Sequence, residues 1–290
     1  MRRAERDTGM KILLWLIAAL AMPLAQAAED ALILGIFPRY KATETTTMYT
    51  PLADHLSARL GRKVTLVTSK DFDSFLKGVA EQRYDIVHYN QYHYIHSAQT
   101  YQVIAHAQEF GKDAVAGALF VRKDSGITDL SQLRGRTIMF GGGKDAMLSY
   151  IAPRFLLMQA GLKEEDFKTE FSVNPPNAIL ALYHKQADAA GGGDIIVDLP
   201  VVKNAINTEE LRLLAKTEPL LFLPWAVKRT MAAPLRDAIR SILVDLGNSE
   251  NGRNVLRSAK ATGMGKSDDK DYNPHRKMTT AVFGRQGIAK

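Results

Sequence analysis

Short apolar stretches alternate with amphipathic stretches along most of this chain. A short apolar run is typical of a buried strand, whereas apolar residues at every third or fourth position are typical of a helix that covers a sheet. The predicted strands are Leu32–Phe37, Val64–Val67, Tyr84–Val87, Val103–Ala107, Ala116–Val121, Thr137–Phe140, Phe167–Val173, Ala187–Ala190, Leu211–Ala215 and Leu220–Val227. This alternation predicts an α/β fold in which mostly parallel sheets carry helices on both faces.

Capping residues and glycines mark where several helices should begin and end. Thr50 is a suitable cap and Pro51 fits a first turn, so a helix is expected from there to Gly61. Another should begin near Lys144, with irregular first turns because Pro153 lies inside it. The further predicted helices follow Asp71 or span Gln91–Thr100, Pro175–Gln186, Asp198–Asn207, Ala233–Gly247 and Asn251–Ala259, and the polar tail from Lys260 gives no clear prediction.

Segment Met10–Ala27 has the three parts of a secretory signal. Lys11 provides a positive start, Ile12–Met22 is apolar, and Ala25-Gln26-Ala27 fits a small-residue cleavage site. The apolar run is short for a membrane span, so we predict cleavage after Ala27 and no stable membrane insertion afterwards. An uncleaved anchor is the alternative. No cysteine stands at the cleavage point, which argues against a lipid-anchored protein.

The composition is that of an ordinary globular protein: 290 residues, 46% hydrophobic and 24% charged. This length is enough for two lobes with separate cores. The chain has no cysteine, which excludes disulfides and thiolate metal ligands. The formal net charge is +7, and +5 without residues 1–27. No basic block with interleaved aromatic residues predicts nucleic-acid binding.

The glycine-rich turn Gly141-Gly142-Gly143 lies between a predicted strand and a predicted helix. Glycines let backbone N–H groups approach a ligand, and a helix N-terminus adds unpaired N–H groups and a partial positive charge. With Lys144 the turn predicts an anion cradle. Asp145 would instead pair with Lys144 or receive a cationic or hydroxyl group of the ligand. A tight connection without a ligand is the alternative.

Two other strand ends carry candidate ligand contacts. Arg39 and Tyr40 follow the first strand, and an arginine there suits a carboxylate or oxyanion. Residues 88–96 are rich in histidine and tyrosine, and His88, Asn90 and Tyr94 are the candidates for lining a polar cleft. His88, His93 and His96 also raise the alternative of a metal site or an enzyme. No carboxylate is spaced to complete such a metal site locally.

Several blocks of the chain resemble the periplasmic phosphate/phosphite/phosphonate-binding proteins of ABC transporters. They are YDIVHYNQYHY, RKDSGITDLSQLRGRTIMFGGG, SYIAPRFLLMQAGL, ILALYHKQADAA and, at the first helix, PLADHLSARLG. The resemblance implies the two-lobed type II periplasmic-binding-protein fold. Lobe one would be 28–117 and 220–290, lobe two 118–219, with hinge crossings near Ala116–Phe120 and Lys216–Phe222. It also implies a periplasmic location, an ABC permease as partner, and a monomer.

Departures from the family pattern lie at its ligand contacts. Residues Lys144 to Met147 stand where the family has Ser and Thr hydroxyls, and Pro175-Pro176-Asn177 stands where it has a contacting His and an acidic residue. The family's acidic cluster is replaced by Gly191-Gly192-Gly193-Asp194, and its tyrosine in lobe one is matched by Tyr94. Asn177 and Asp194 therefore complete the candidate site residues.

The sequence as a whole predicts a periplasmic solute-binding protein of an ABC importer. It would close its lobes around a small polar or anionic ligand, such as a phosphonate-like or phosphate-like oxyanion. A periplasmic subunit that presents its ligand to a membrane histidine kinase or receptor is the alternative. No catalytic triad, paired carboxylate motif or nucleotide fingerprint is present, so neither an enzyme nor a cofactor is predicted.

Overall fold

The structure is a computed structural model that describes residues 31–284. The predicted signal segment and cleavage site lie outside the described residues. Within residues 31–284 no helix is both long and apolar enough to cross a membrane.

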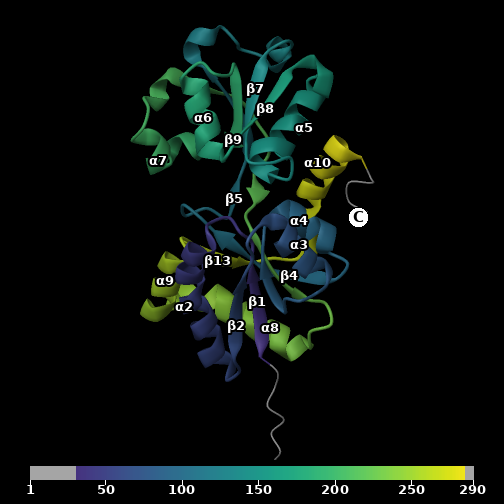
Figure 1. Cartoon of the computed structure of the whole chain (residues 1–290), viewed down its shortest axis with the longest axis vertical. Helices are drawn as coiled ribbons and strands as arrows, with labels where there is room; N and C mark the ends of the chain where they lie inside the picture. Colours follow the sequence, from purple (N-terminus) through teal and green to yellow (C-terminus); the bar gives the residue numbers. More distant parts are fainter. Residues whose placement is uncertain (1–30, 285–290) are drawn as a thin grey trace, which may run out of the picture. The chain divides into compact units, whose positions relative to one another are not determined.

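The first sheet has six strands in the spatial order β13–β4–β12–β3–β1–β2 (Figure 1). Its strands are β1 (Leu32–Ile36), β2 (Val64–Thr68), β3 (Ile86–His88), β4 (Tyr101–Gln108), β12 (Pro224–Lys228) and β13 (Gly263–Lys266). Strand β1 pairs in parallel with β2 and β3, whereas β12 is antiparallel to β3 and β4, and β13 to β4. Strands β1 to β4 therefore run in one direction, as the sequence predicted, and the two late strands run against them.

The second sheet has five strands in the order β10–β6–β9–β7–β8. They are β6 (Gly117–Arg122), β7 (Thr137–Gly141), β8 (Lys168–Ser172), β9 (Ala189–Gly193) and β10 (Leu211–Lys216). Strand β7 is parallel to β8 and β9, while β6 is antiparallel to β9 and β10. Four strands share one direction here, which agrees with the α/β fold class.

Two short segments connect the sheets and pair with each other. They are β5 (Ala114–Val115) and β11 (Leu220–Leu221), which form an antiparallel ribbon. The ribbon continues through hydrogen bonds from the Thr217 N–H to the Gly117 carbonyl, 2.9 Å, and from the Gly117 N–H to Thr217 Oγ1, 3.1 Å. Both passages between the sheets are thus held side by side.

Nine helices of the described chain carry α labels: α2 (Ala42–Leu60), α3 (Phe72–Ala80), α4 (Gln91–Ser97), α5 (Ala152–Gln159), α6 (Pro175–Tyr183), α7 (Pro200–Lys203), α8 (Ala233–Val244), α9 (Glu250–Ser258) and α10 (Asn273–Phe283). Helices α2, α8 and α9 pack together beside the first sheet, and α3 packs on α4. On the second sheet, α6 packs against β7 and β9, and α5 against β6. The predicted helix 198–207 is limited to one turn, because Asn204 already caps α7.

Helix α2 begins at Ala42, so the prediction that a helix starts at Thr50-Pro51 was wrong. Pro51 lies inside the helix, where it cannot donate to the carbonyl four residues earlier, that of Thr47. Ser258 of α9 compensates, since its hydroxyl lies 3.4 Å from that carbonyl and 3.0 Å from the Met48 carbonyl. The helix ends as predicted, with Gly61 in the left-handed conformation at φ +63°.

The helical segment after β7 begins at Met147, three residues later than predicted. Its first five residues, Met147–Ile151, form a π-helical turn that runs into α5, and Pro153 lies at the start of α5. The expected irregular first turns are confirmed. The strand predicted at Ala187–Ala190 is β9 and extends through Gly191–Gly193. A Cβ atom on Gly191 would lie 2.3 Å from the Ser149 carbonyl oxygen, so the bare backbone lets the π-helical turn rest on this strand.

The C-terminal tail, for which the sequence gave no prediction, forms β13 and α10. Helix α10 packs against both α4 and α5 (Figure 1). Its Met278 joins the buried cluster of the second sheet. The tail escaped prediction because its apolar positions are few and are separated by charged residues.

The core has one part on the first sheet and one on each face of the second sheet. Trp225, Tyr101 and Phe75 are among the fully buried side chains of the first. In β6, Leu119 and Val121 belong to one cluster of the second sheet, while Ala118 and Phe120 belong to the other. The alternation shows that both faces of β6, an interior strand of the second sheet, are covered.

Candidate functional site

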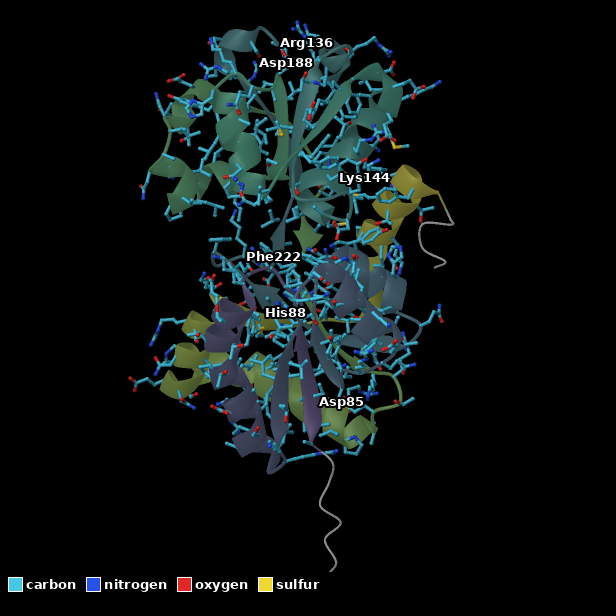
Figure 2. The ribbon with its side chains drawn as sticks, viewed as in Figure 1. Asp85, His88, Arg136, Lys144, Asp188 and Phe222 are labelled. Carbon is cyan, nitrogen blue, oxygen red and sulfur yellow. The ribbon has the colours of Figure 1, made fainter. Side chains whose placement is uncertain are left out.

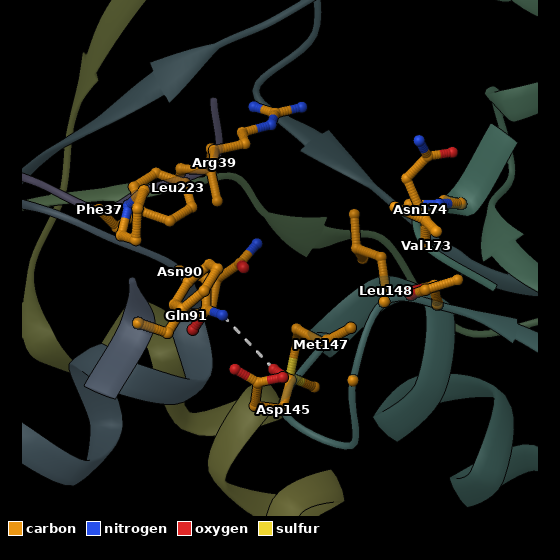
Figure 3. A pocket seen from close by; sticks show the side chains of 18 of the residues that line it. Phe37, Arg39, Asn90, Gln91, Asp145, Met147, Leu148, Val173, Asn174 and Leu223 are labelled. Atoms are coloured by element: carbon orange, nitrogen blue, oxygen red, sulfur yellow. Dashed lines mark hydrogen bonds between the residues drawn. The ribbon is translucent and has the colours of Figure 1, made fainter. Parts of the chain in front are cut away.

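A pocket of about 720 Å3 lies where the strand ends of the two sheets face each other (Figure 3). Pockets of this size are typical of small-molecule sites, and the carboxyl ends of parallel strands are where α/β folds place them. Its lining comes from the segments after β1, β2 and β3, the segments after β7 and β8, and the passage before β12. The residues are Phe37, Pro38, Arg39, Phe72, Asn90, Gln91, Gly141, Gly142, Gly143, Asp145, Ala146, Met147, Leu148, Ser149, Ser172, Val173, Asn174, Pro175, Phe222 and Leu223.

The turn after β7 is held tightly against the neighbouring strand end. Gly142 has φ +85°, and its N–H donates to the Ser172 carbonyl at 2.9 Å. A Cβ atom on Gly141 would lie 2.2 Å from the Cα atom of Pro175, so this position requires glycine. The Ser149 hydroxyl donates to the Gly141 carbonyl at 2.5 Å. The turn is thereby fixed as one wall of the pocket.

Asp145 joins this turn to the first-sheet side of the pocket. Its carboxylate Oδ2 lies 3.0 Å from Nε2 of the buried His93 on α4. Asn90 caps α4 by accepting from the His93 N–H, and its amide reaches the Asp145 carbonyl at 3.5 Å (Figure 3). The hydrogen bond from His93 lowers the pKa of the Asp145 carboxyl below its usual value, so Asp145 is ionised at neutral pH. The Asp145 side chain stays 38% exposed, and can be reached from the pocket.

Arg39 follows β1 at the opposite part of the lining. Its guanidinium donates to Glu109 through Nη1 at 2.7 Å and Nη2 at 3.4 Å. This two-point contact fixes the guanidinium and balances its charge. Arg39 can still donate through its other N–H groups, but adds no net charge to the pocket.

The start of α6 forms the far wall. The Asn174 side chain accepts from the Asn177 N–H at 3.0 Å and so caps the helix. Pro175 and Pro176 occupy the first two helical positions and have no N–H groups. The helix start therefore has no free N–H among its first three residues.

Six of the twelve predicted site residues line this pocket: Arg39, Asn90, Gly141, Gly142, Gly143 and Asp145. Five of the six lie at the carboxyl end of a strand or within three residues of it, and Asp145 lies four residues after the end of β7. Their spacing from the strands was the signal that the sequence offered.

His88, Tyr94 and Tyr40 do not line the pocket, although the sequence predicted them there. His88 is the last residue of β3, in the first sheet (Figure 2). Its ring stacks on that of Trp225, with ring centres 4.2 Å apart. Tyr94 is fully buried, and its hydroxyl donates to Asp269 at 2.5 Å. Tyr40 instead lies under the ammonium of Lys260, 4.3 Å from the ring centre. His88 and Tyr94 are used in packing because each lies on the inward side of its element, whereas Tyr40 is half-buried in the loop between β1 and α2.

Lys144, Asn177 and Asp194 also lie away from the lining. Lys144 pairs with Glu164 at 3.2 Å. Asn177 is exposed, and Asp194 pairs with Lys216 at 3.3 Å and lies 3.3 Å from the Ala116 N–H, beside the passage between the sheets. The helix begins only at Met147, so Lys144 is not at a helix N-terminus as predicted.

Sequence reasoning missed most of the apolar lining and several polar groups. The missed side chains that face the pocket include Phe37, Phe72, Gln91, Met147, Leu148, Ser149, Ser172, Asn174 and Leu223. Phe72 and Gln91 are the first residues of α3 and α4, and each follows a helix cap, of which only Asp71 was predicted. The apolar residues gave no such signal, because apolar residues at strand ends usually belong to the core.

The three histidines of the metal alternative do not converge on one point. His88 Nδ1 contacts the Pro224 carbonyl, His93 Nε2 contacts Asp145, and His96 Nδ1 contacts the Tyr92 carbonyl. Across residues 31–284 there is no group of three or more His, Asp or Glu side chains placed to hold a metal ion. The geometry gives no support to the metal or enzyme alternative.

Residues 34–272 match the family model of the periplasmic substrate-binding protein of ABC phosphonate transporters. The chain belongs to this family. It is 22% identical over 272 residues to the phosphonates-binding periplasmic protein of Escherichia coli K12, a match that covers 91% of this chain and 80% of that protein. The protein is thus a substrate-binding component of an ABC transporter, a role that implies a small-molecule ligand and a permease partner.

Solved structures share the fold. A Xanthomonas citri protein bound to ATP aligns with a TM-score of 0.75 and 17% identity, covering 89% of this chain and 98% of that one. A Prochlorococcus marinus protein in complex with methylphosphonate aligns with a TM-score of 0.70 and 17% identity, covering 88% and 98%. The aliphatic sulphonate binding protein of Escherichia coli aligns with a TM-score of 0.58 and 15% identity, covering 90% and 89%. These matches establish the type II periplasmic-binding-protein fold predicted from the sequence.

Proposed function

We propose that the protein captures its ligand in the pocket of about 720 Å3 and closes around it. The observation that carries this proposal is that the lining comes from the strand ends of both sheets. A ligand that contacts both walls stabilises the closed arrangement more than the open one, and so shifts the population toward it. The closed form is then what the permease recognises.

The moving parts in this proposal are lobe one, residues 28–117 and 220–290, and lobe two, residues 118–219. The paired segments β5 and β11 support this division, since they connect the sheets and a short ribbon can bend. Helix α10 contacts α4 of lobe one and α5 of lobe two. It is therefore a third place, besides the two connecting segments, at which the lobes are joined during closure. The protein would act as a monomer in the periplasm after removal of residues 1–27, without enzymatic activity.

The names of the relatives suggest the first ligands to test. We propose a small polar or anionic solute, and phosphate, methylphosphonate, alkanesulfonates and small carboxylates form the screen. Thermal shift and calorimetry on residues 28–290 measure binding. If none of these classes binds in a saturable way, the proposed capture function is contradicted.

Closure is measured separately by fluorescence energy transfer. The chain has no cysteine, so exposed Lys63 and Glu165 can be changed to cysteine and labelled without interference. The two positions belong to different proposed lobes. A bound ligand should raise the transfer efficiency. A saturable ligand that leaves the efficiency unchanged would contradict the hinge mechanism while leaving the binding role intact.

A further inference from the structure

The pocket is larger than the smallest ligands of the screen. Its volume is about 720 Å3, and pockets of that size accommodate ligands of drug size. Phosphate and methylphosphonate carry at most one methyl group besides their oxyanion, so either of them fills only a small part of the space. The side chains around the remaining space therefore decide which substituent the ligand carries.

Backbone donors for an oxyanion lie on the second-sheet side of the pocket. The N–H groups of Tyr150 and Ile151 both donate to the Ala146 carbonyl, at 2.9 and 3.1 Å. The N–H groups of Met147 and Leu148 precede these bonds, in the first turn of the helical segment. Backbone N–H groups in a first turn have no partner within the helix and suit an anion. An oxyanion can therefore bind there, as the proposed capture function requires.

Side-chain donors add to these N–H groups. The Gln91 amide nitrogen donates one N–H to a backbone carbonyl at 3.0 Å, and the Asn90 amide nitrogen donates one to the Asp145 carbonyl at 3.5 Å. Each amide nitrogen carries two N–H groups, so one remains on each. Arg39 likewise keeps N–H groups besides the two that contact Glu109. The oxygens of an oxyanion thus find donors in the lining.

An apolar surface lies on the first-sheet side of the pocket. Phe37 follows β1, Phe72 begins α3, and Leu223 precedes β12. The rings of Phe37 and Phe72 contact each other edge to face, with their centres 6.2 Å apart. Figure 3 shows Phe37 and Leu223 on the opposite side of the pocket from Leu148 and Val173. Because these side chains have no polar atoms, the surface on the first-sheet side suits a hydrocarbon or aromatic group of the ligand.

Phe72 is the exposed part of this surface. It stays 37% exposed although its ring has the rings of Phe37 and His93 as neighbours, with centres 6.2 and 5.7 Å away. Burial of exposed apolar area is favourable because it removes that area from water. A ligand with an apolar body would cover the Phe72 ring, whereas a bare oxyanion would leave it in water.

We propose that the ligand is an oxyanion with an apolar body, an aromatic ring or a short hydrocarbon chain, and that Phe37 and Phe72 select this body. The proposal rests on the proposed capture function and names the substituent of its ligand. The oxyanion lies against the first-turn N–H groups of Met147 and Leu148, and the body lies against the two rings. Such a ligand contacts both sides of the pocket and therefore favours closure more than a bare oxyanion does.

Pairs of anions that differ only in the body test the proposal. Phenylphosphonate is compared with methylphosphonate, benzenesulfonate with methanesulfonate, and benzoate with acetate. Calorimetry on residues 28–290 measures binding. In at least one pair the aromatic member should bind about tenfold more tightly or better, because burial of the added carbon atoms contributes to the binding free energy. The pair that shows this difference also identifies the oxyanion.

A second comparison changes the polarity of the body at constant length. Propylphosphonate and 2-aminoethylphosphonate differ in whether a methyl or an ammonium group ends the chain. Asp145 is the only acidic side chain among the described lining residues, and it would favour the ammonium group. The apolar surface favours the methyl group, so propylphosphonate should bind about threefold more tightly or better. Equal or tighter binding of 2-aminoethylphosphonate overturns the proposal.

Variants at the exposed ring locate the effect. Phe72→Ala removes the ring and should weaken phenylphosphonate binding about tenfold, while methylphosphonate binding changes by less than about twofold. Phe72→Leu keeps an apolar side chain and should retain most of the preference. Phe171→Ala is the matched control, because Phe171 is 41% exposed and does not line the pocket. It should leave both affinities unchanged, and circular dichroism shows whether the variants are folded.

The outcomes separate this proposal from the function on which it rests. Equal or weaker binding of the aromatic member in every pair overturns the proposal for an apolar body and keeps the capture function. A preference that Phe72→Ala leaves unchanged shows that this ring does not contact the ligand, and it overturns the proposal too. Absence of saturable binding by every probe, small or aromatic, contradicts the capture function as well.

Discussion

Two segments near the pocket contribute to its lining in the opposite way from what their compositions suggest. Residues 88–96 contain three histidines and three tyrosines, and such groups often bind ligands. In the fold, His88, His93 and Tyr94 are buried, and only Asn90 and Gln91 of the segment line the pocket. Residues 141–149 begin with three glycines and contain few polar groups, yet eight of these nine residues, Asp145 among them, line the pocket.

The difference comes from where each residue lies on its element. A residue at the end of a strand points inward or outward according to the two-residue period of the strand, whatever its chemistry. His88 is directed into the first sheet, where it stacks on Trp225. The glycine turn has no side chains to bury, so its backbone can approach β8 and leave the following residues around the pocket.

The largest expected effect comes from adding a methyl group to the turn. In Gly141→Ala the new Cβ would lie 2.2 Å from Pro175 Cα and 2.3 Å from its nitrogen, both backbone atoms that cannot move freely. Such overpacking should lower the free energy of unfolding by about 3 kcal/mol. Urea titration measures it. Gly247→Ala is the matched control, since nothing lies within 4 Å of its added Cβ, and should change the value by less than about 0.5 kcal/mol.

If Gly141→Ala were as stable as Gly247→Ala, the turn would be free to move. The comparison would then fail, because it contrasts residues 88–96, which buried rings hold in place, with the turn 141–143, which close backbone packing of its glycines holds in place.

The fold was largely predictable, because it depends on repeated patterns. The strands β1, β2, β7 and β10 and the caps Asp71 and Gly61 follow from apolar runs and from residues with strong positional preferences. The start of helix α2 was placed too late, because its first two turns are rich in threonine. The hydrogen bond from Ser258 to the Thr47 carbonyl, which compensates for Pro51, comes from a distant part of the chain.

The site was only half predictable, for a different physical reason. The strand-end rule found Arg39, Asn90 and the glycine turn. It could not show that Arg39 is balanced by Glu109, seventy residues away, or that His93 reaches Asp145. Those pairings decide the charge of the pocket, and they depend on tertiary contacts that local sequence does not encode.

The burial of two histidines, His88 and His275, predicts that the stability of the protein depends on pH. Burial lowers the pKa of His88 to about 3 and that of His275 to about 4, against an ordinary value of 6.5. Below pH 6.5 the unfolded chain binds protons that the folded chain excludes, so stability falls as the pH falls. Between pH 6.5 and 5 each histidine should lower the free energy of unfolding by about 2 kcal/mol.

The variant His88→Asn isolates one of these contributions. Its amide nitrogen can replace Nδ1 as the donor to the Pro224 carbonyl, so a folded protein is expected despite the lost stacking. The free energies of unfolding obtained from urea titrations at pH 6.5 and pH 5 should differ less in this variant than in the parent, by about 2 kcal/mol. His184→Gln, at an exposed position, should keep the parental difference. A parental difference in His88→Asn would mean that His88 is accessible to protons, contrary to the comparison.

The smallest expected effect concerns the start of α6, which has no free N–H among its first three residues. In Pro175→Ala the first helical residue regains an N–H in the direction of the proline ring, which lines the pocket. One neutral hydrogen bond should strengthen methylphosphonate binding roughly 2- to 10-fold in calorimetric titration, while the lost proline lowers stability by about 0.4–1 kcal/mol. Pro200→Ala changes a proline at the same helical position of α7, away from the pocket, and should lower stability alone. Equal methylphosphonate affinity in the two variants would show that the start of α6 does not face the ligand.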